Sequence, residues 1–274
     1  MKFFIKTAVI FTLFYFAYFN LYAQHKNEEL KRIEVLFDKL FYAKSDSVKL
    51  NINQLIVKEL RAYTENKHDF ITDFKEIKNL SVIKSDDDYI YILNWAVQYS
   101  KQNLQYFGFI KFYNRNRGEY YVEEMIDVQD IKNDVGKKVY LDKWYGALYY
   151  KIVTIKYKGE RHYVLLGWDG NDDFTNKKLI DILYLEDDDT PVLGKEIMEY
   201  EGQTVSRLVF EYGERVSMSL RYDEKNKQII WDHLSPSKQE LKGHYEYYGP
   251  DLSFDALLFD KGIWKYIPDI EINQ

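Results

Sequence analysis

Apolar positions in the first third of the chain recur at the spacing of α-helices. Across residues 27–44, leucine, isoleucine and phenylalanine recur three or four residues apart, which places them on one helix face. Residues 45–47 are polar and can cap a second helix, and a third, shorter helix starts near Asp69. The apolar positions expected on these faces are Leu30, Ile33, Phe37, Leu40, Phe41, Val48, Ile52, Leu55, Ile56, Leu60, Phe70, Phe74 and Ile77.

From about Leu80 the period of the pattern changes from 3.6 to 2 and predicts β-strands. These runs are rich in aromatic and β-branched residues, and polar or glycine-containing turns such as Lys158-Gly159-Glu160 separate them. The expected strands are 88–99, 104–113, 119–128, 145–157, 161–168, 179–185, 205–212, 215–222, 228–233, 255–259 and 263–267.

The short links between these strands favour antiparallel neighbours, because a parallel pair needs a crossover of about a dozen residues or more. The expected fold class is therefore α+β with β dominant: N-terminal helices followed by a large antiparallel β-meander. Whether the sheet closes as a sandwich, a barrel or a propeller-like arrangement stays open. Residues 24–80 form the helical segment and residues 81–274 the β domain, and we expect the two to form one globular unit.

The first 23 residues have the pattern of a cleaved secretory signal peptide. Lys2 and Lys6 form a positive n-region, the run from Thr7 to Phe19 is almost entirely apolar, and Ala23 provides a small residue for cleavage. The alternative is an uncleaved anchor, but Thr7 to Ala23 is shorter than the ~20 apolar residues of a spanning helix and contains Asn20. The prediction is a secreted or periplasmic protein without a transmembrane segment in the mature chain.

Charge and cysteine content narrow the function classes. The formal net charge is −6, and cleavage after Ala23 would leave the mature chain more acidic, which argues against nucleic acid as a partner. The chain has no cysteine, so it has no disulfide, no thiolate nucleophile and no residue to carry the lipid of a bacterial lipoprotein. An exported chain of this size without disulfides indicates a bacterial envelope or exterior.

Near the C-terminus, the stretch IIWDHLSPSKQELKGHYEYYGPD gathers polar side chains after a strand. Pro236 is expected to stop strand pairing and Gly249-Pro250 to form a turn, which leaves a loop of about twenty residues between the strands. Long loops on a rigid sheet often carry binding groups. The candidate residues of this stretch are Asp232, His233, His244 and Asp251.

Three interpretations of these residues stay open. The four could bind a metal through nitrogen and oxygen, or Ser235 or Ser237 could be activated by a histidine that a carboxylate holds. The stretch contains neither H-E-x-x-H nor G-x-S-x-G spacing. The favoured interpretation is that both histidines form hydrogen bonds to the backbone and that the packing of the aromatic residues fixes the loop in place.

A second candidate site follows Trp168. Asp169, Asn171 and Asp173 match the first ligand positions of a calcium loop, but Phe174 replaces the glycine of its sharp turn and Ile180 its bidentate glutamate. The favoured interpretation is a polar turn, with no metal or cofactor, and calcium at these three residues is the alternative. The triplets 86–88 and 187–189 are expected to be solvated acidic turns.

Several phrases taken together resemble a group of uncharacterised secreted proteins from Bacteroidota. They run in order from about Ser85 to Tyr266: SDDDYIYILNW, YFGFIKFY, WYGALYYKI, LLGWDGND, TNKKLIDIL, VFEYGERVSMSLRYD, IIWDHLSP, YYGPDLSFDA and KGIWKY. The resemblance implies an exported or envelope-associated protein of a Gram-negative bacterium. That group has no assigned activity, so the resemblance assigns no catalytic residue.

Two hypotheses of function follow. The first is a non-enzymatic β-rich module of the bacterial envelope that binds a ligand or partner, either an envelope protein or a glycan. The second is an exported hydrolase acting on glycans or other envelope polymers, motivated by the many carboxylates and by aromatic residues, which make up 18% of the chain. Five tryptophans are candidates for sugar stacking, although most rings of a meander fill its core: Trp95, Trp144, Trp168, Trp231 and Trp264.

Overall fold

The structure, a computed structural model, describes residues 28–66, 70–99, 104–128 and 138–271. The chain forms two compact units, Met1–Lys78 and Asn79–Gln274. The expected signal peptide lies outside the described residues. Within the described ranges, the structure contains no helix that combines the length and the hydrophobicity needed to traverse a bilayer.

The first unit is helical, as its apolar spacing predicts. It contains a helix over residues 28–42, α2 (Asp46–Asn66) and α3 (Ile71–Phe74). The Ser45 hydroxyl accepts a hydrogen bond from the backbone N–H of Val48 at 3.4 Å, which caps α2. Tyr63 of α2 packs on Phe74 with ring centroids 4.9 Å apart and donates to Asp73 at 2.7 Å.

Three residues of the expected apolar faces are in fact exposed. Phe41 is 67% exposed, Val48 47% and Leu55 49%, so these three residues lie outside the buried stripe of their helices. The buried stripe is narrower than the apolar pattern suggests because it follows Asn53, Ile56 and Leu60 along α2. A helix can carry additional apolar residues beside the stripe that its neighbours cover.

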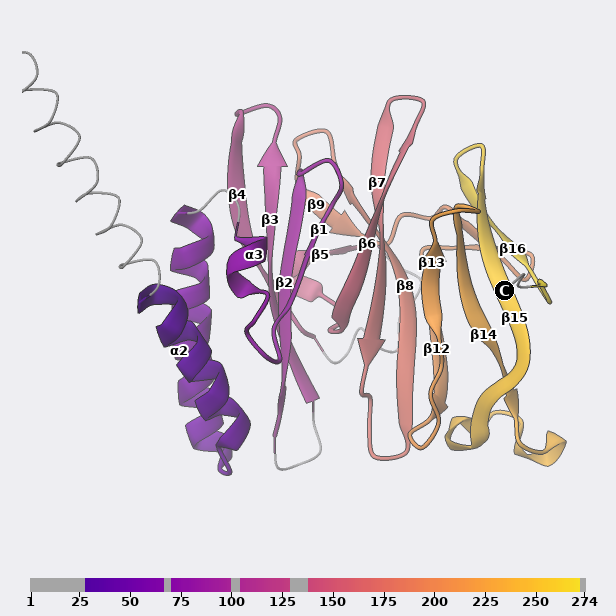
Figure 1. Cartoon of the computed structure of the whole chain (residues 1–274). Coiled ribbons are helices and arrows are strands. Elements are labelled where there is room, and N and C mark those ends of the chain that lie inside the picture. The colour runs from indigo at the N-terminus through magenta and orange to yellow at the C-terminus, as the bar shows by residue number, and fades with distance from the viewer. Residues whose placement is uncertain (1–27, 67–69, 100–103, 129–137, 272–274) are drawn as a thin grey trace, which may run out of the picture. The chain divides into compact units, whose positions relative to one another are not determined.

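The second unit contains three β-sheets, which Figure 1 shows in succession from magenta through orange to yellow. The N-terminal sheet has the order β1-β2-β3-β4, with β1 (Ser81–Lys84), β2 (Ile90–Gln98), β3 (Leu104–Asn114) and β4 (Glu119–Ile126). The middle sheet has the order β5-β9-β8-β7-β6, with β5 (Val139–Tyr140), β6 (Leu148–Tyr157), β7 (Glu160–Asp169), β8 (Thr175–Leu185) and β9 (Pro191–Leu193). A further strand, β12 (Arg207–Gly213), pairs with the first half of β8.

The C-terminal sheet completes the unit. Its order is β11-β10-β16-β15-β14-β13, with β10 (Met198–Tyr200), β11 (Gln203–Val205), β13 (Leu220–Asp223), β14 (Gln228–Pro236), β15 (Tyr248–Asp260) and β16 (Ile263–Ile267). The described residues are β-dominant, and their sheets are antiparallel except where β10 runs parallel to β16. The long chain path between these two strands makes a parallel pair feasible.

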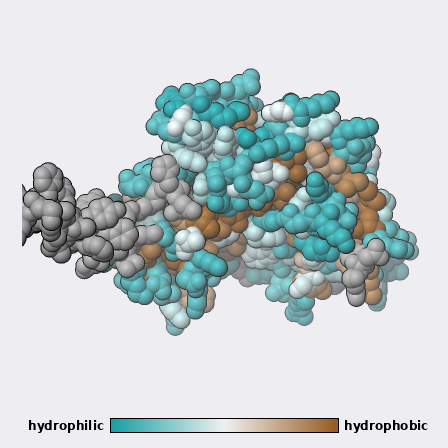
Figure 2. Space-filling view, turned by 45° about the horizontal axis from the view of Figure 1, so that its top comes forward, coloured by the Kyte–Doolittle hydropathy of each residue, from teal (hydrophilic) through white to brown (hydrophobic). Residues whose placement is uncertain are grey.

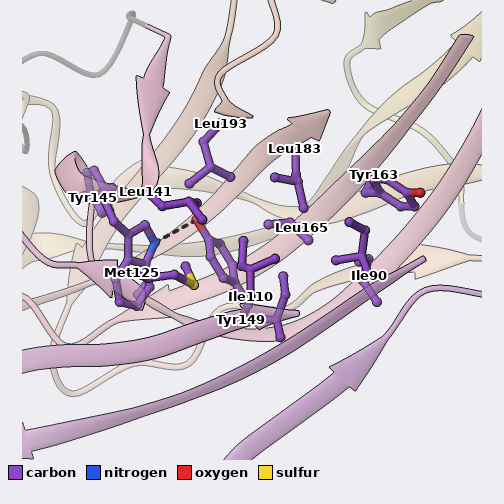
Figure 3. Packing of buried hydrophobic residues seen from close by; sticks show 14 of the residues in the cluster. Ile90, Ile110, Met125, Leu141, Tyr145, Tyr149, Tyr163, Leu165, Leu183 and Leu193 are labelled. Carbon is purple, nitrogen blue, oxygen red and sulfur yellow. Dashed lines mark hydrogen bonds between the residues drawn. The ribbon is translucent and has the colours of Figure 1, made fainter. Parts of the chain in front are cut away.

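The middle sheet is buried on both faces, and its strands show why. On β7, Tyr163 and Leu165 belong to the core shared with the N-terminal sheet, and Val164 and Leu166 to the core shared with the C-terminal sheet. Successive residues of a strand point to opposite faces, so a continuous apolar run serves two cores. Figure 3 shows the first of these cores, where Tyr149, Leu165 and Leu183 meet.

The C-terminal hairpin differs from its expected form. Pro236 was expected to stop pairing, but β14 extends to it and its partner is Tyr248, so the loop spans only residues 237–247. Pro250, expected in a turn, lies inside β15 opposite Leu234. Proline is tolerated here because β16 pairs with β15 only from Ala256 onward, which leaves Pro250 on an edge with no bond to donate.

Candidate functional site

A cleft of about 440 Å³ lies at one end of the middle sheet. It forms where the β6–β7 turn, the last residues of β8 and the β3–β4 turn of the N-terminal sheet meet, and its lining is more polar than apolar. The lining residues are Arg115, Gly159, Glu160, Arg161, Tyr163, Tyr184, Leu185, Glu186, Asp187 and Lys195. In Figure 2, hydrophilic side chains cover much of the visible face of the β unit, with apolar side chains between them.

The β6–β7 turn positions one wall of this cleft. Lys158 and Gly159 both have positive φ, 50° and 87°, as in the two-residue turns that match the twist of a hairpin. The sequence Lys158-Gly159-Glu160 predicted this hairpin, but the turn is one residue shorter than expected because Glu160 already pairs with Tyr157. The tight turn places Glu160 and Arg161 at the start of β7, beside the end of β8.

The guanidinium of Arg161 is held in place from two sides. Its Nε atom lies 2.8 Å from Oδ2 of Asp87, whose side chain is only 8% exposed, and its Cζ atom lies 4.1 Å from the centre of the Tyr89 ring. Asp87 is held in turn by the Ser85 hydroxyl, which donates to its other oxygen at 2.7 Å. A planar guanidinium stacked on a ring and paired on one edge keeps a defined orientation.

Arg115, on the β3–β4 turn, is oriented in a similar way. Its Nε donates to Oδ1 of Asp189 at 2.7 Å, and the backbone N–H groups of Arg115 and Asn116 donate to Oδ2 at 2.8 and 3.2 Å. Asp189 is fully buried and has a positive φ of 66°. The triplet 187–189 was expected to be a solvated turn, and for Asp189 this is wrong because its carboxylate joins two sheets.

Two of the three carboxylates that line the cleft, Glu160 and Glu186, are paired with cations. Lys195 donates to Glu160 at 2.7 Å and lies over the Tyr184 ring, and Lys138 donates to Glu186. The hydrogen bond and the charge of Lys195 lower the pKa of Glu160. A general acid needs a carboxyl with a raised pKa, and the pKa of Glu160 is shifted in the opposite direction.

The residues after Trp168 lie at the opposite end of β7 from the cleft. Asp169 is fully buried, where it accepts the Tyr106 hydroxyl at 2.9 Å and the backbone N–H of Asn171 at 3.0 Å. Trp168 itself is half-buried. Burial and the Asp169 charge raise the pKa of Tyr106, so this tyrosine is a neutral donor.

The other two positions of the calcium-like pattern face different partners. Asn171 has a positive φ of 33°, and its side-chain oxygen accepts the Lys177 ammonium at 2.9 Å. Its amide donates to Thr175 at 2.6 Å, while Asp173 is exposed. The Lys177 ammonium is therefore hydrogen-bonded to the Asn171 oxygen that a calcium loop would use as a ligand. Across the described ranges, the structure contains no cluster of three or more histidine, aspartate or glutamate side chains placed to hold a metal ion.

His233 and Asp251 lie where β14 and β15 change register. Nδ1 of His233 lies 2.8 Å from Oδ2 of Asp255, which is nearly buried, and this hydrogen bond raises the pKa of His233. Ser235 donates to Asp251 at 3.1 Å, and its hydroxyl makes no hydrogen bond to His233. The pairing skips from Asp232 to Leu234 on β14, so the histidine lies opposite a bulge of β15.

The remaining residues of this stretch are dispersed. Asp232 accepts the backbone N–H of Ser219 at 2.7 Å, and His244 lies on the loop, 3.8 Å from Glu246. Leu252, in the bulge, is 91% exposed with a φ of 76°, a strained conformation for leucine. The structure thus pairs His233 with the carboxylate of Asp255, so the expectation that this histidine bonds to backbone was wrong.

The comparisons with protein-family models, with curated proteins and with solved structures find no match for this chain. The function must therefore be argued from the geometry of the sites.

Proposed function

We propose that the protein is an exported, non-enzymatic binding module of a bacterial envelope and that it takes a polar glycan ligand in the end cleft. The observation that carries the proposal is the cleft itself, where two arginines held by carboxylates that are buried or nearly buried line the wall together with Tyr184. Its volume of about 440 Å³ lies within the range of small-ligand sites.

A glycan suits this cleft better than a protein partner does. Sugar hydroxyls both donate and accept, as the mixed charges of Arg161, Glu160 and Lys195 require, and the apolar face of a sugar ring can pack on Tyr184. A protein partner would need a larger surface with an apolar centre. The proposed envelope location rests on the N-terminal pattern and on the Bacteroidota resemblance.

An exported hydrolase is the second candidate, and the His233–Asp255 pair favours it. An imidazole whose Nδ1 is held by a carboxylate is the arrangement of a general base. Ser235 is bonded to Asp251 instead of His233, so a serine nucleophile is not assembled. Release of reducing ends from an envelope polysaccharide, lost in His233→Ala, would favour this alternative over the binding module.

We expect Tyr184→Ala to weaken glycan binding about tenfold or more, because the substitution removes the aromatic face of the cleft. The measurement is calorimetric titration of the mature chain with oligosaccharides released from a Gram-negative envelope. Tyr184→Phe keeps the ring and should bind nearly as the native protein does. Tyr245→Ala, which removes an exposed tyrosine on the 237–247 loop, is the matched control and should have no effect. Equal affinities for Tyr184→Ala and the native protein would contradict the proposal.

A further inference from the structure

Both guanidiniums of the cleft have N–H groups to spare. Arg115 directs Nε and Nη2 at Oδ1 of Asp189, and its Nη1 makes no hydrogen bond in the described part of the chain. Nε of Arg161 lies 2.8 Å from Oδ2 of Asp87 as an ion pair but makes no hydrogen bond to a described residue, and neither do the terminal nitrogens. Each guanidinium carries five N–H donors, so donors remain on two side chains that line one cleft.

The carboxylates orient these side chains and still leave their outer edges available. Asp189 is fully buried and Asp87 is 8% exposed, so both are fixed behind the cleft wall. Asp87 also lies 3.8 Å from Lys156, so two cations share its charge. A guanidinium that is paired on one edge and stacked on a ring presents its other edge in a fixed direction, which suits two parallel hydrogen bonds to an anion.

The cleft has a weak long-range electrostatic potential, because three carboxylates line it together with three cationic side chains. These are Glu160, Glu186 and Asp187 with Arg115, Arg161 and Lys195. Selectivity for an anion must therefore come from directed hydrogen bonds. Lys195 can contribute to them, because its partner Glu160 is 74% exposed and can turn to solvent when a ligand carboxylate takes its place.

We infer that the cleft recognises an acidic glycan, and that Arg115 and Arg161 bind its anionic group, a carboxylate or a phosphate, through their free N–H groups. This inference rests on the proposed glycan-binding function and adds the chemical class of the ligand. Tyr184 lines the remaining wall, where the ring that carries the anionic group would pack.

The test is calorimetric titration of the mature chain with three probes: tri-galacturonate, the same trisaccharide after reduction of its carboxyl groups, and glucose 1-phosphate. We expect tri-galacturonate or glucose 1-phosphate to bind at least about tenfold more tightly than the carboxyl-reduced trisaccharide. Whichever acidic probe binds identifies the anionic group as a carboxylate or a phosphate.

Variants locate the anion in the cleft. Arg161→Gln should lose at least about tenfold in affinity for the acidic probe, and Arg161→Lys, which keeps the charge but not the fork, should lose most of that amount. Arg215→Gln removes an exposed arginine from the β12–β13 link and should leave binding unchanged.

The outcomes separate the two proposals. Equal binding of the acidic and reduced trisaccharides, weakened by Tyr184→Ala but not by Arg161→Gln, would overturn the acidic ligand and leave glycan binding intact. If neither Arg161→Gln nor Arg115→Gln changes the affinity for the acidic probe, the anion binds elsewhere, and this result would also overturn the inference. Failure of all three probes to bind would contradict both proposals.

Discussion

Replacement of Asp181 by asparagine should destabilise the protein by about 3–5 kcal/mol. Asp181 and Arg207 are both fully buried between the sheets, with Nε and Nη2 of the arginine 2.8 and 2.6 Å from Oδ2 of the carboxylate. The Tyr149 hydroxyl donates to the same oxygen at 3.1 Å, and the indole N–H of Trp144 donates to that hydroxyl at 3.2 Å. Loss of the negative charge leaves a buried guanidinium without its counterion.

The pKa of Arg207 shows the same balance. Burial opposes the charge of this arginine, but the attraction and hydrogen bonds of Asp181, together with smaller contributions from Tyr149 and Tyr145, outweigh burial and raise the pKa. The pair is therefore expected to stay ionised. Nη1 of Arg207 is buried without a hydrogen-bond partner among the described residues, which makes the loss of Asp181 harder to compensate.

Urea unfolding of the native protein and Asp181→Asn at neutral pH measures this effect. The double variant Asp181→Leu with Arg207→Met removes both charges and should recover most of the lost stability, because it leaves no buried ion unpaired. Asp260→Asn breaks the exposed pair with Lys265 and should leave the unfolding midpoint unchanged. A midpoint for Asp181→Asn equal to that of Asp260→Asn would contradict the burial of this pair.

The second large effect is a loss of stability in mild acid that depends on His162. This histidine of β7 is 3% exposed, its ring lies 5.6 Å from that of Phe259, and its Nε2 is buried without a partner in the described residues. Burial lowers the pKa of His162 to about 4 from the usual 6.5, and the charge of Lys195 acts in the same direction. Between about pH 4 and pH 6.5, His162 is therefore protonated in the unfolded chain but not in the folded chain.

His162 therefore contributes fully to stability above pH 6.5, and this contribution is lost as the pH falls toward 4. The expected loss is roughly 3 kcal/mol. We expect His162→Phe, which keeps a ring against Phe259, not to show this pH-dependent loss of stability. The difference in unfolding free energy between the variant and the native protein should shift in favour of the variant by that amount between about pH 7 and pH 4. A difference independent of pH would show that His162 is protonated in the folded state or exposed.

The long strands could be predicted because their patterns are strong. The expected strand at residues 263–267 is β16 itself, and the runs at 104–113 and 161–168 fall within a residue of β3 and β7. Alternating apolar positions and turns such as Lys158-Gly159 define these elements locally. The local pattern does not show which sheets pack against each other. The continuous apolar run of β7 therefore did not reveal that this strand contributes to two cores.

The missed strands are short or depend on distant partners. The strands β5, β9, β10 and β11 each span two or three residues, too few for a period to emerge. The extension of β14 to Pro236 depends on its pairing with Tyr248, which local proline rules do not anticipate.

The cleft was missed for a related reason. Arg115 and Arg161 lie on different sheets, and only the three-dimensional packing of two turns brings them together. The available signals were the two basic turns NRNRG and KGER, each adjacent to a predicted strand end. Asp169 and Asn171 were singled out because of their spacing, but the fold uses their oxygens to receive Tyr106 and Lys177.

A crystal structure of the protein grown with the most tightly bound oligosaccharide tests glycan binding in the cleft most directly. We expect a sugar in the end cleft, packed on Tyr184, with an acidic group within hydrogen-bond distance of Arg115 and Arg161. A sugar bound at the His233 bulge with the end cleft empty would contradict it.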